Sequence, residues 1–88
     1  MNEDGKVHRL KIMPEFYQAV IDGRKTFELR RNDRDFSIGD TLILCDWNGE
    51  GFTGREWRCQ VEYMLEGYAG LQPGYAILGL SPARSLTP

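Results

Sequence analysis

Charged side chains crowd into one stretch of this 88-residue chain, between residues 23 and 36. The stretch holds five cations and three acids, namely Arg24, Lys25, Arg30, Arg31, Arg34, Glu28, Asp33 and Asp35. Charges of this density are costly to bury unless they are paired. They therefore form a mutually paired network or meet a charged ligand, and the surplus of cations favours an anionic one.

Lys25 and Glu28 are the pair of this stretch best suited to chemistry. In a cleft, the ammonium would attract a phosphate or carbonyl oxygen, and the carboxylate would accept a hydrogen bond from an exocyclic amine. If the protein is an enzyme, these two are the candidate catalytic residues. The alternative is a structural ion pair.

Three arginines extend the candidate site: Arg30, Arg34 and Arg55. Their planar guanidinium groups could clamp a phosphate through parallel hydrogen bonds. They could equally pair with nearby carboxylates as a structural network, and the sequence leaves both interpretations open.

Two residues of the first expected strand are further candidates. His8 alternates onto one face with Leu10 and Ile12, which favours a hydrogen-bonded histidine at the edge of the core over a ligand contact. Lys11 lies on the opposite, polar face, where it contacts a ligand or is solvated.

A glycine-rich loop supplies two more candidates, Phe52 and Thr53. Phe52 could stack on a nucleic-acid base, as aromatic residues do in single-strand binders. Thr53, with the Gly54-Arg55 that follows it, could present a hydroxyl and backbone N–H groups to an anion. The alternative is an ordinary turn.

These candidates depend on five expected strands and one helix. The helix begins at Pro14 and ends at Gly23, because proline suits the first helical position and glycine tolerates a positive φ. Phe16, Ala19 and Val20 recur at helical spacing, so we expect them to face the core. The strands are expected at residues 7–12, 25–31, 41–47, 55–65 and 75–80.

The strand at residues 25–31 carries the charged motif. Side chains of an extended chain alternate between two faces, so Phe27 and Leu29 share one face while Glu28 and Arg30 share the other. This predicts an apolar anchor beneath a row of ions.

The strands at 41–47 and 55–65 are expected to form a hairpin. A register in which paired residue numbers sum to 104 places Trp47 opposite Trp57 and Cys45 opposite Cys59. This register predicts two free thiols side by side.

The whole chain is expected to form one domain over residues 7–81, with a disordered N-terminus at 1–6 and a loose tail at 82–88. Its length leaves no room for βαβ crossovers, so we expect an α+β fold built around a small closed or nearly closed barrel.

Composition excludes several classes of protein. A net charge of −2 argues against a generic electrostatic nucleic-acid binder, so any such role must be local. Two cysteines and one histidine are too few for a four-ligand zinc site without carboxylates, and we expect no metal and no cofactor. No apolar run approaches the roughly 18 residues of a membrane span, and the default compartment is the cytoplasm.

The motif Gly23-x-Lys25-x-x-Glu28-x-Arg30 and the later turn Gly39-Asp40 resemble the ASCH group of the PUA-like superfamily, small β-barrels with helices at the barrel mouth. A subfamily of small bacterial and phage proteins of unknown function is more similar still. It shares the opening around His8 and a run whose residues are Asn32, Asp33, Arg34, Asp35 and Phe36.

The resemblance implies binding of RNA or a nucleotide in a charged cleft at the barrel mouth. One enzymatic branch of the group looks like an amidohydrolase of acylated cytidine, and its catalytic lysine corresponds to Lys25. Because of this match at Lys25, a small amidohydrolase of N-acylated nucleosides is the alternative function, although that branch has threonine where Glu28 stands. A protein-interaction scaffold is the third possibility.

Overall fold

The computed structural model describes residues 5–81. Its elements, in chain order, are β1 (Val7–Ile12), α1 (Pro14–Ile21), β2 (Phe27–Arg31), β3 (Thr41–Trp47), β4 (Phe52–Glu66) and β5 (Tyr75–Leu80). The predicted order is confirmed, with β2 shorter and β4 longer than expected. The predicted tail at 82–88 lies outside the described residues, as does the predicted disordered N-terminus except for residues 5 and 6. Lys6 is bonded, because its backbone N–H donates to Asp40 Oδ1 at 3.0 Å.

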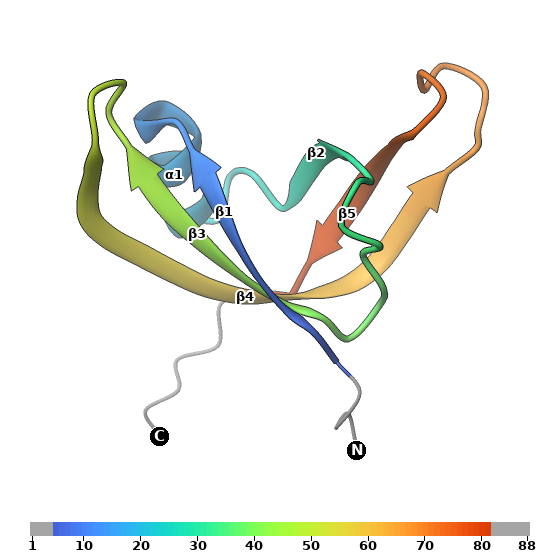
Figure 1. The fold of residues 1–88 in the computed structure, drawn as a ribbon, viewed down its shortest axis with the longest axis horizontal. Coiled ribbons are helices and arrows are strands. Elements are labelled where there is room, and N and C mark those ends of the chain that lie inside the picture. Colours follow the sequence, from blue (N-terminus) through green and yellow to red (C-terminus); the bar gives the residue numbers. More distant parts are fainter. Residues whose placement is uncertain (1–4, 82–88) are drawn as a thin grey trace.

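The five strands form one mixed sheet in the order β1-β3-β4-β5-β2. β1 runs parallel to β3, and every other neighbouring pair is antiparallel. Figure 1 shows β4 curving across the molecule, with β3 and β1 on one wing and β5 and β2 on the other. This confirms a small α+β fold with one short helix. Within the described chain, no helix has the length and apolar character needed to cross a membrane.

The expected closure into a barrel is wrong. In the described sheet, β1 and β2 are the two edge strands and do not pair with each other. Arginine side chains from the β2 region bridge them instead. Arg30 Nη2 donates to the carbonyl of Lys11 at 2.7 Å, and Arg34 Nη1 donates to the carbonyl of Arg9 at 2.8 Å. These side chains occupy acceptors on the edge of β1 that a closing strand would otherwise use.

The core lies inside the bend of the sheet and includes the predicted Leu10 and Ile12 of β1. α1 begins at Pro14, as predicted, and Gly23 follows its last turn with φ +82°. The face that the helix buries differs from the prediction. Tyr17 and Val20 are buried, whereas Phe16 is 46% exposed. Spacing alone allowed either of two overlapping stripes, and the position of the helix on the sheet selects the one with Tyr17.

The hairpin register is also different from the one predicted. Leu42 pairs with Cys59 and Cys45 pairs with Glu56, so the paired numbers sum to 101. The reason is a shorter loop over residues 48–51, in which Asn48 Oδ1 accepts hydrogen bonds from the backbone N–H groups of Glu50 and Gly51. Because side chains alternate along a strand, Cys45 and Cys59 lie on opposite faces of the sheet. Both thiols are free, but they are not side by side.

A β-bulge in β4 splits its apolar stripe into two parts. The register shifts between Val61 and Tyr63, and one extra residue at a bulge reverses the faces of those that follow. Cys59 and Val61 are therefore buried in the core, while Tyr63 is 64% exposed on the other face. Met64 packs on the core in its place.

Candidate functional site

Strand β2 presents its charged motif inward, which reverses the predicted polarity. Glu28 pairs with Leu78 of β5 and is only 4% exposed. Phe27 and Leu29 are 44% and 53% exposed on the outside. The register with β5 therefore places Glu28 and Arg30 on the core side of β2, and it places Phe27 and Leu29 toward solvent.

Glu28 is the centre of a three-residue ion network. Lys25 Nζ donates to Glu28 Oε1 at 2.5 Å. Arg30 Nε and Nη2 approach Glu28 Oε2 at 2.9 and 2.8 Å. This pairing offsets the cost of taking the carboxylate out of water. For these three residues the structure therefore has the paired network that the sequence left as one of two alternatives, and each oxygen of the central carboxylate already has a cationic donor.

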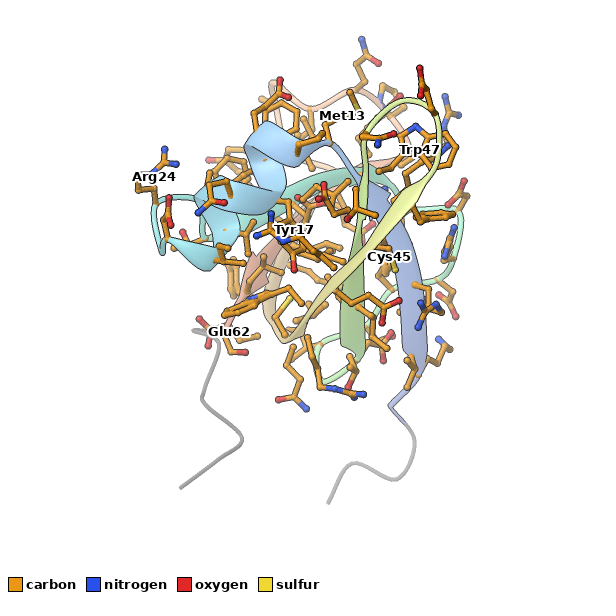
Figure 2. The ribbon with its side chains drawn as sticks, turned by 90° about the vertical axis from the view of Figure 1, so that its left-hand side faces the viewer. Met13, Tyr17, Arg24, Cys45, Trp47 and Glu62 are labelled. Atoms are coloured by element: carbon orange, nitrogen blue, oxygen red, sulfur yellow. The ribbon has the colours of Figure 1, made fainter. Side chains whose placement is uncertain are left out.

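The other predicted arginine–carboxylate pairs are arranged differently. Arg34 donates to the backbone of β1. Asp35 pairs with Lys6 at 3.3 Å instead of with an arginine. Arg24, which follows α1, pairs with Asp22 at 3.1 Å and projects away from the body of the protein in Figure 2.

A concavity of about 480 Å³ lies between the start of α1 and β2, next to the ion network. Its apolar lining includes four half-exposed side chains: Met13, Phe16, Phe27 and Leu29. Its charged lining consists of four cations and one acid: Lys11, Lys25, Arg30, Arg31 and Glu28. We call this concavity the cationic groove.

The cations of the groove differ in what they already contact. Lys25 and Arg30 are committed to Glu28. Lys11 lies with Nζ 4.4 Å from the ring centroid of Trp47, and the Arg31 guanidinium lies 5.3 Å from that of Tyr75. Lys11 and Arg31 are exposed, and among the described residues their charged groups contact aromatic rings and no carboxylate. They are therefore the groove cations best placed to meet a ligand.

A second concavity, of about 460 Å³, lies between the end of α1 and strands β4 and β5. Lys25 lines both concavities, and Trp57 and Cys59 line this one. Burial raises the pKa of the Cys59 thiol to about 12, and the charge of Glu28 adds to the effect. Cys59 is therefore protonated at neutral pH and is not a nucleophile.

Three of the predicted site residues lie in the β3–β4 hairpin, and none of them lines the cationic groove. The Arg55 guanidinium stacks on the Tyr17 ring at 4.7 Å. Phe52 packs edge-on against Trp47, with ring centroids 5.0 Å apart. Figure 2 shows Tyr17 and Trp47 in this region.

The third hairpin residue, Thr53, binds a buried acid that the sequence predictions missed. Thr53 Oγ1 donates to Asp46 Oδ2 at 3.0 Å, while Asp46 Oδ1 has no hydrogen-bond partner among the described residues. The sequence signal that could have identified Asp46 was the presence of an acid within the apolar run at 41–47.

Tyr17 lies near this acid and beneath Arg55. Burial raises the pKa of the Tyr17 hydroxyl, and the charge of Arg55 partly opposes that rise.

His8 is buried, and it does not line the cationic groove. Its Nε2 lies 2.8 Å from Asp40 Oδ2, and its ring packs edge-on against Phe36. Burial raises the pKa of the Asp40 carboxyl, but hydrogen bonds from Lys6, His8 and Ser37 outweigh this and hold it below its usual value. His8 thus lies at the edge of the core with a hydrogen-bonded ring, which is the interpretation that the sequence favoured.

Within residues 5–81, no group of three or more histidine, cysteine, aspartate or glutamate side chains is placed to hold a metal ion. The side chains of the cationic groove offer apolar and aromatic surface beside positive charge, which suits a ligand that is both flat and anionic.

Comparison with known proteins gives a relative in a phage. The chain is 38% identical over 56 residues to the "Uncharacterized 12.9 kDa protein in GpA 3'region" of Escherichia phage P2. The match covers 64% of this chain and 51% of the phage protein, so the chain spans about half the length of that relative. Residues 7–80 match the sequence profile of a family described as a domain of unknown function, DUF3850. Because that match includes every strand and the helix, the chain belongs to the DUF3850 family.

Proposed function

We propose that this protein is an RNA- or nucleotide-binding module and that the cationic groove is its binding site. The observation that carries the proposal is the composition of the groove. Four cations and one already-paired acid surround half-exposed apolar side chains, on a chain whose net charge is −2. A base would pack on the apolar lining while its phosphate meets the exposed cations.

Lys11 and Arg31 are the proposed phosphate contacts. Lys25 and Arg30 hold Glu28 and serve to position the wall of the groove. The motif residues Gly23, Lys25, Glu28 and Arg30 also support an ASCH-type, PUA-like relationship, in which this protein would be an open-sheeted variant. We propose that relationship together with the binding function.

Affinity measured by fluorescence anisotropy or calorimetry, with nucleotides and short RNAs at low salt, tests the site. We expect Lys11→Ala and Arg31→Ala each to weaken binding about tenfold, since a charge-assisted hydrogen bond contributes roughly 1.5 to 3 kcal/mol. The matched control is Arg58→Ala, an exposed arginine on β4 that does not line the groove. Affinity should also fall with salt along a shallow slope, because few phosphates are contacted.

Equal affinities for wild type, Lys11→Ala and Arg31→Ala would show that the site has been placed wrongly. Lys25→Ala and Arg30→Ala are less informative, because each would leave a buried carboxylate partly unpaired. The amidohydrolase alternative gains no support from the geometry, because neither oxygen of Glu28 is available to act as a base without breaking an ion pair. A protein-interaction scaffold would instead use exposed apolar side chains such as Phe27 and Leu29.

A further inference from the structure

The face of the β2–β5–β4 wing that points away from the core is mostly apolar. Strand pairing aligns its residues in three rows across the wing. The rows are Phe27-Gly79-Tyr63, Leu29-Ile77-Leu65 and Arg31-Tyr75. We call this surface the outer face. Large contiguous apolar patches on protein surfaces often mark interaction or ligand-binding sites.

Three aromatic rings stand on the outer face, one from each strand. They belong to Phe27 of β2, Tyr75 of β5 and Tyr63 of β4. Phe27 and Tyr63 flank Gly79, about two strand spacings apart, or roughly 10 Å. A β-carbon at position 79 would come within 3.3 Å of Tyr63 Cβ, so the glycine gives the Tyr63 side chain its room.

The charge on and around these rings favours an anionic occupant. Lys25 Nζ lies 4.8 Å from the Phe27 ring centroid, and the Arg31 guanidinium lies 5.3 Å from that of Tyr75. None of the eight residues in the three rows is acidic. Rings presented by neighbouring strands, with cations beside them, match the way that sheet surfaces stack unpaired bases and hold their phosphates.

The outer face is continuous with the cationic groove. Phe27, Leu29, Arg31 and Tyr75 belong to the outer face and also line the groove. Tyr63 lies further away, on β4, and does not line the groove. A single nucleic-acid strand whose phosphate is held in the groove would therefore reach the outer face by crossing β2. Tyr63 would lie at the far end of that path.

We propose that the outer face binds single-stranded RNA as an extension of the cationic groove, with bases stacked on Phe27, Tyr75 and Tyr63. This inference rests on the proposed function and deepens it, because it names an unpaired strand of several nucleotides as the ligand. A duplex is excluded as the preferred ligand, since its bases are stacked on one another and cannot cover separate rings.

The test compares two ligands, AMP and an unstructured octaribonucleotide, on the intact chain. The octamer should bind at least about tenfold more tightly than AMP, and a duplex of the same sequence should bind more weakly than the single strand. Tyr63→Ala should weaken octamer binding about tenfold, the effect of losing one stacked base, and should leave AMP affinity unchanged. Tyr63→Phe, which keeps the ring, should bind both ligands like wild type.

Tyr68→Ala is the matched control, because Tyr68 is 65% exposed but lies in the loop after β4. If AMP binds and Arg31→Ala weakens it, while Tyr63→Ala leaves octamer affinity unchanged, the outer-face inference is wrong and the groove proposal stands. If neither ligand binds, both proposals fail. A wild-type dimer that Tyr63→Ala converts to monomer would show that the face pairs two copies of the chain, and would also overturn the inference.

Discussion

Glu28 illustrates how a single residue of this protein combines burial with charge. A carboxylate that is only 4% exposed would ordinarily be destabilising, but here it accepts hydrogen bonds from two cations that retain some contact with water. The network fixes Lys25 and Arg30 relative to β2, and Arg30 also reaches β1. Glu28 therefore stabilises the wall of the groove without needing to touch a ligand.

Replacing Glu28 with glutamine should lower the free energy of unfolding by about 2 kcal/mol, because the neutral amide cannot balance two neighbouring cations. Chemical denaturation measures the change. The control is Glu56→Gln, whose carboxylate pairs with Arg9 at the surface and should contribute little. Equal losses in the two variants would show that burial does not distinguish these ion pairs.

Asp40 should make stability depend on pH. Its carboxyl has a pKa below the usual value in the folded protein, so its ionised form favours folding. That contribution is present above the unfolded-state pKa of about 3.9 and is lost as pH falls through the lower folded-state value.

The unfolding free energies of wild type and Asp40→Asn should therefore differ by about 1 to 2 kcal/mol at pH 7 and should begin to converge as the pH falls below about 4. Asp33→Asn, at an exposed aspartate, is the control and should track wild type throughout. A wild-type advantage over Asp40→Asn that stays constant down to the acid limit would contradict this assignment.

At the scale of elements, short interruptions decide which side chains each segment presents. The bulge in β4 turns Tyr63 outward, and the glycine after α1 ends the helix so that the chain can enter β2. Gly23 has φ +82°, and a β-carbon there would meet no atom within 4 Å. Position 23 therefore requires glycine because of its backbone conformation and not because a larger side chain would be crowded.

Gly23→Ala should destabilise the protein by about 1 kcal/mol, because a residue with a β-carbon is strained at positive φ. Thermal or chemical denaturation gives the value. Gly51→Ala is the matched control, since position 51 has equal space and no positive φ, and its effect should stay within about 0.5 kcal/mol. If both substitutions cost the same, helix termination does not depend on the conformation of Gly23.

At the scale of the whole molecule, the sheet bends into two wings that share β4 and is left open between β1 and β2 (Figure 1). The opening is bridged by Arg30 and Arg34, and the cationic groove lies beside Arg30. Closure by backbone pairing would have brought β1 directly against β2. The open sheet thus leaves room for the groove between α1 and β2.

The two faces of the sheet also separate the cysteines. Cys45 and Cys59 are both buried, so the folded protein should react slowly with a thiol reagent, and two thiols should titrate after denaturation. Mild oxidation of the folded protein should form no internal disulfide, because the side chains lie on opposite faces. Mass spectrometry showing the loss of two hydrogens from the folded monomer would contradict this arrangement.

The positions of most elements follow from the sequence. Alternation predicted β1, and runs that are apolar on both faces predicted β3 and β5, all with the observed bounds. Pro14 and Gly23 marked the limits of the helix. These signals are local, because they depend on dihedral preferences and on the period of the apolar residues. The charged stretch was likewise visible in the sequence, which left open whether Lys25, Glu28 and Arg30 would pair with one another or meet a ligand.

Which face of β2 and of the second half of β4 is buried was decided only by tertiary structure. A period of two separates Phe27 from Glu28, but either face can point inward when the ions on it neutralise one another. The hairpin register depended on a four-residue loop closed by Asn48, and the split stripe of β4 depended on its bulge. Strand pairing sets all three features, and the period of the apolar residues alone does not specify that pairing.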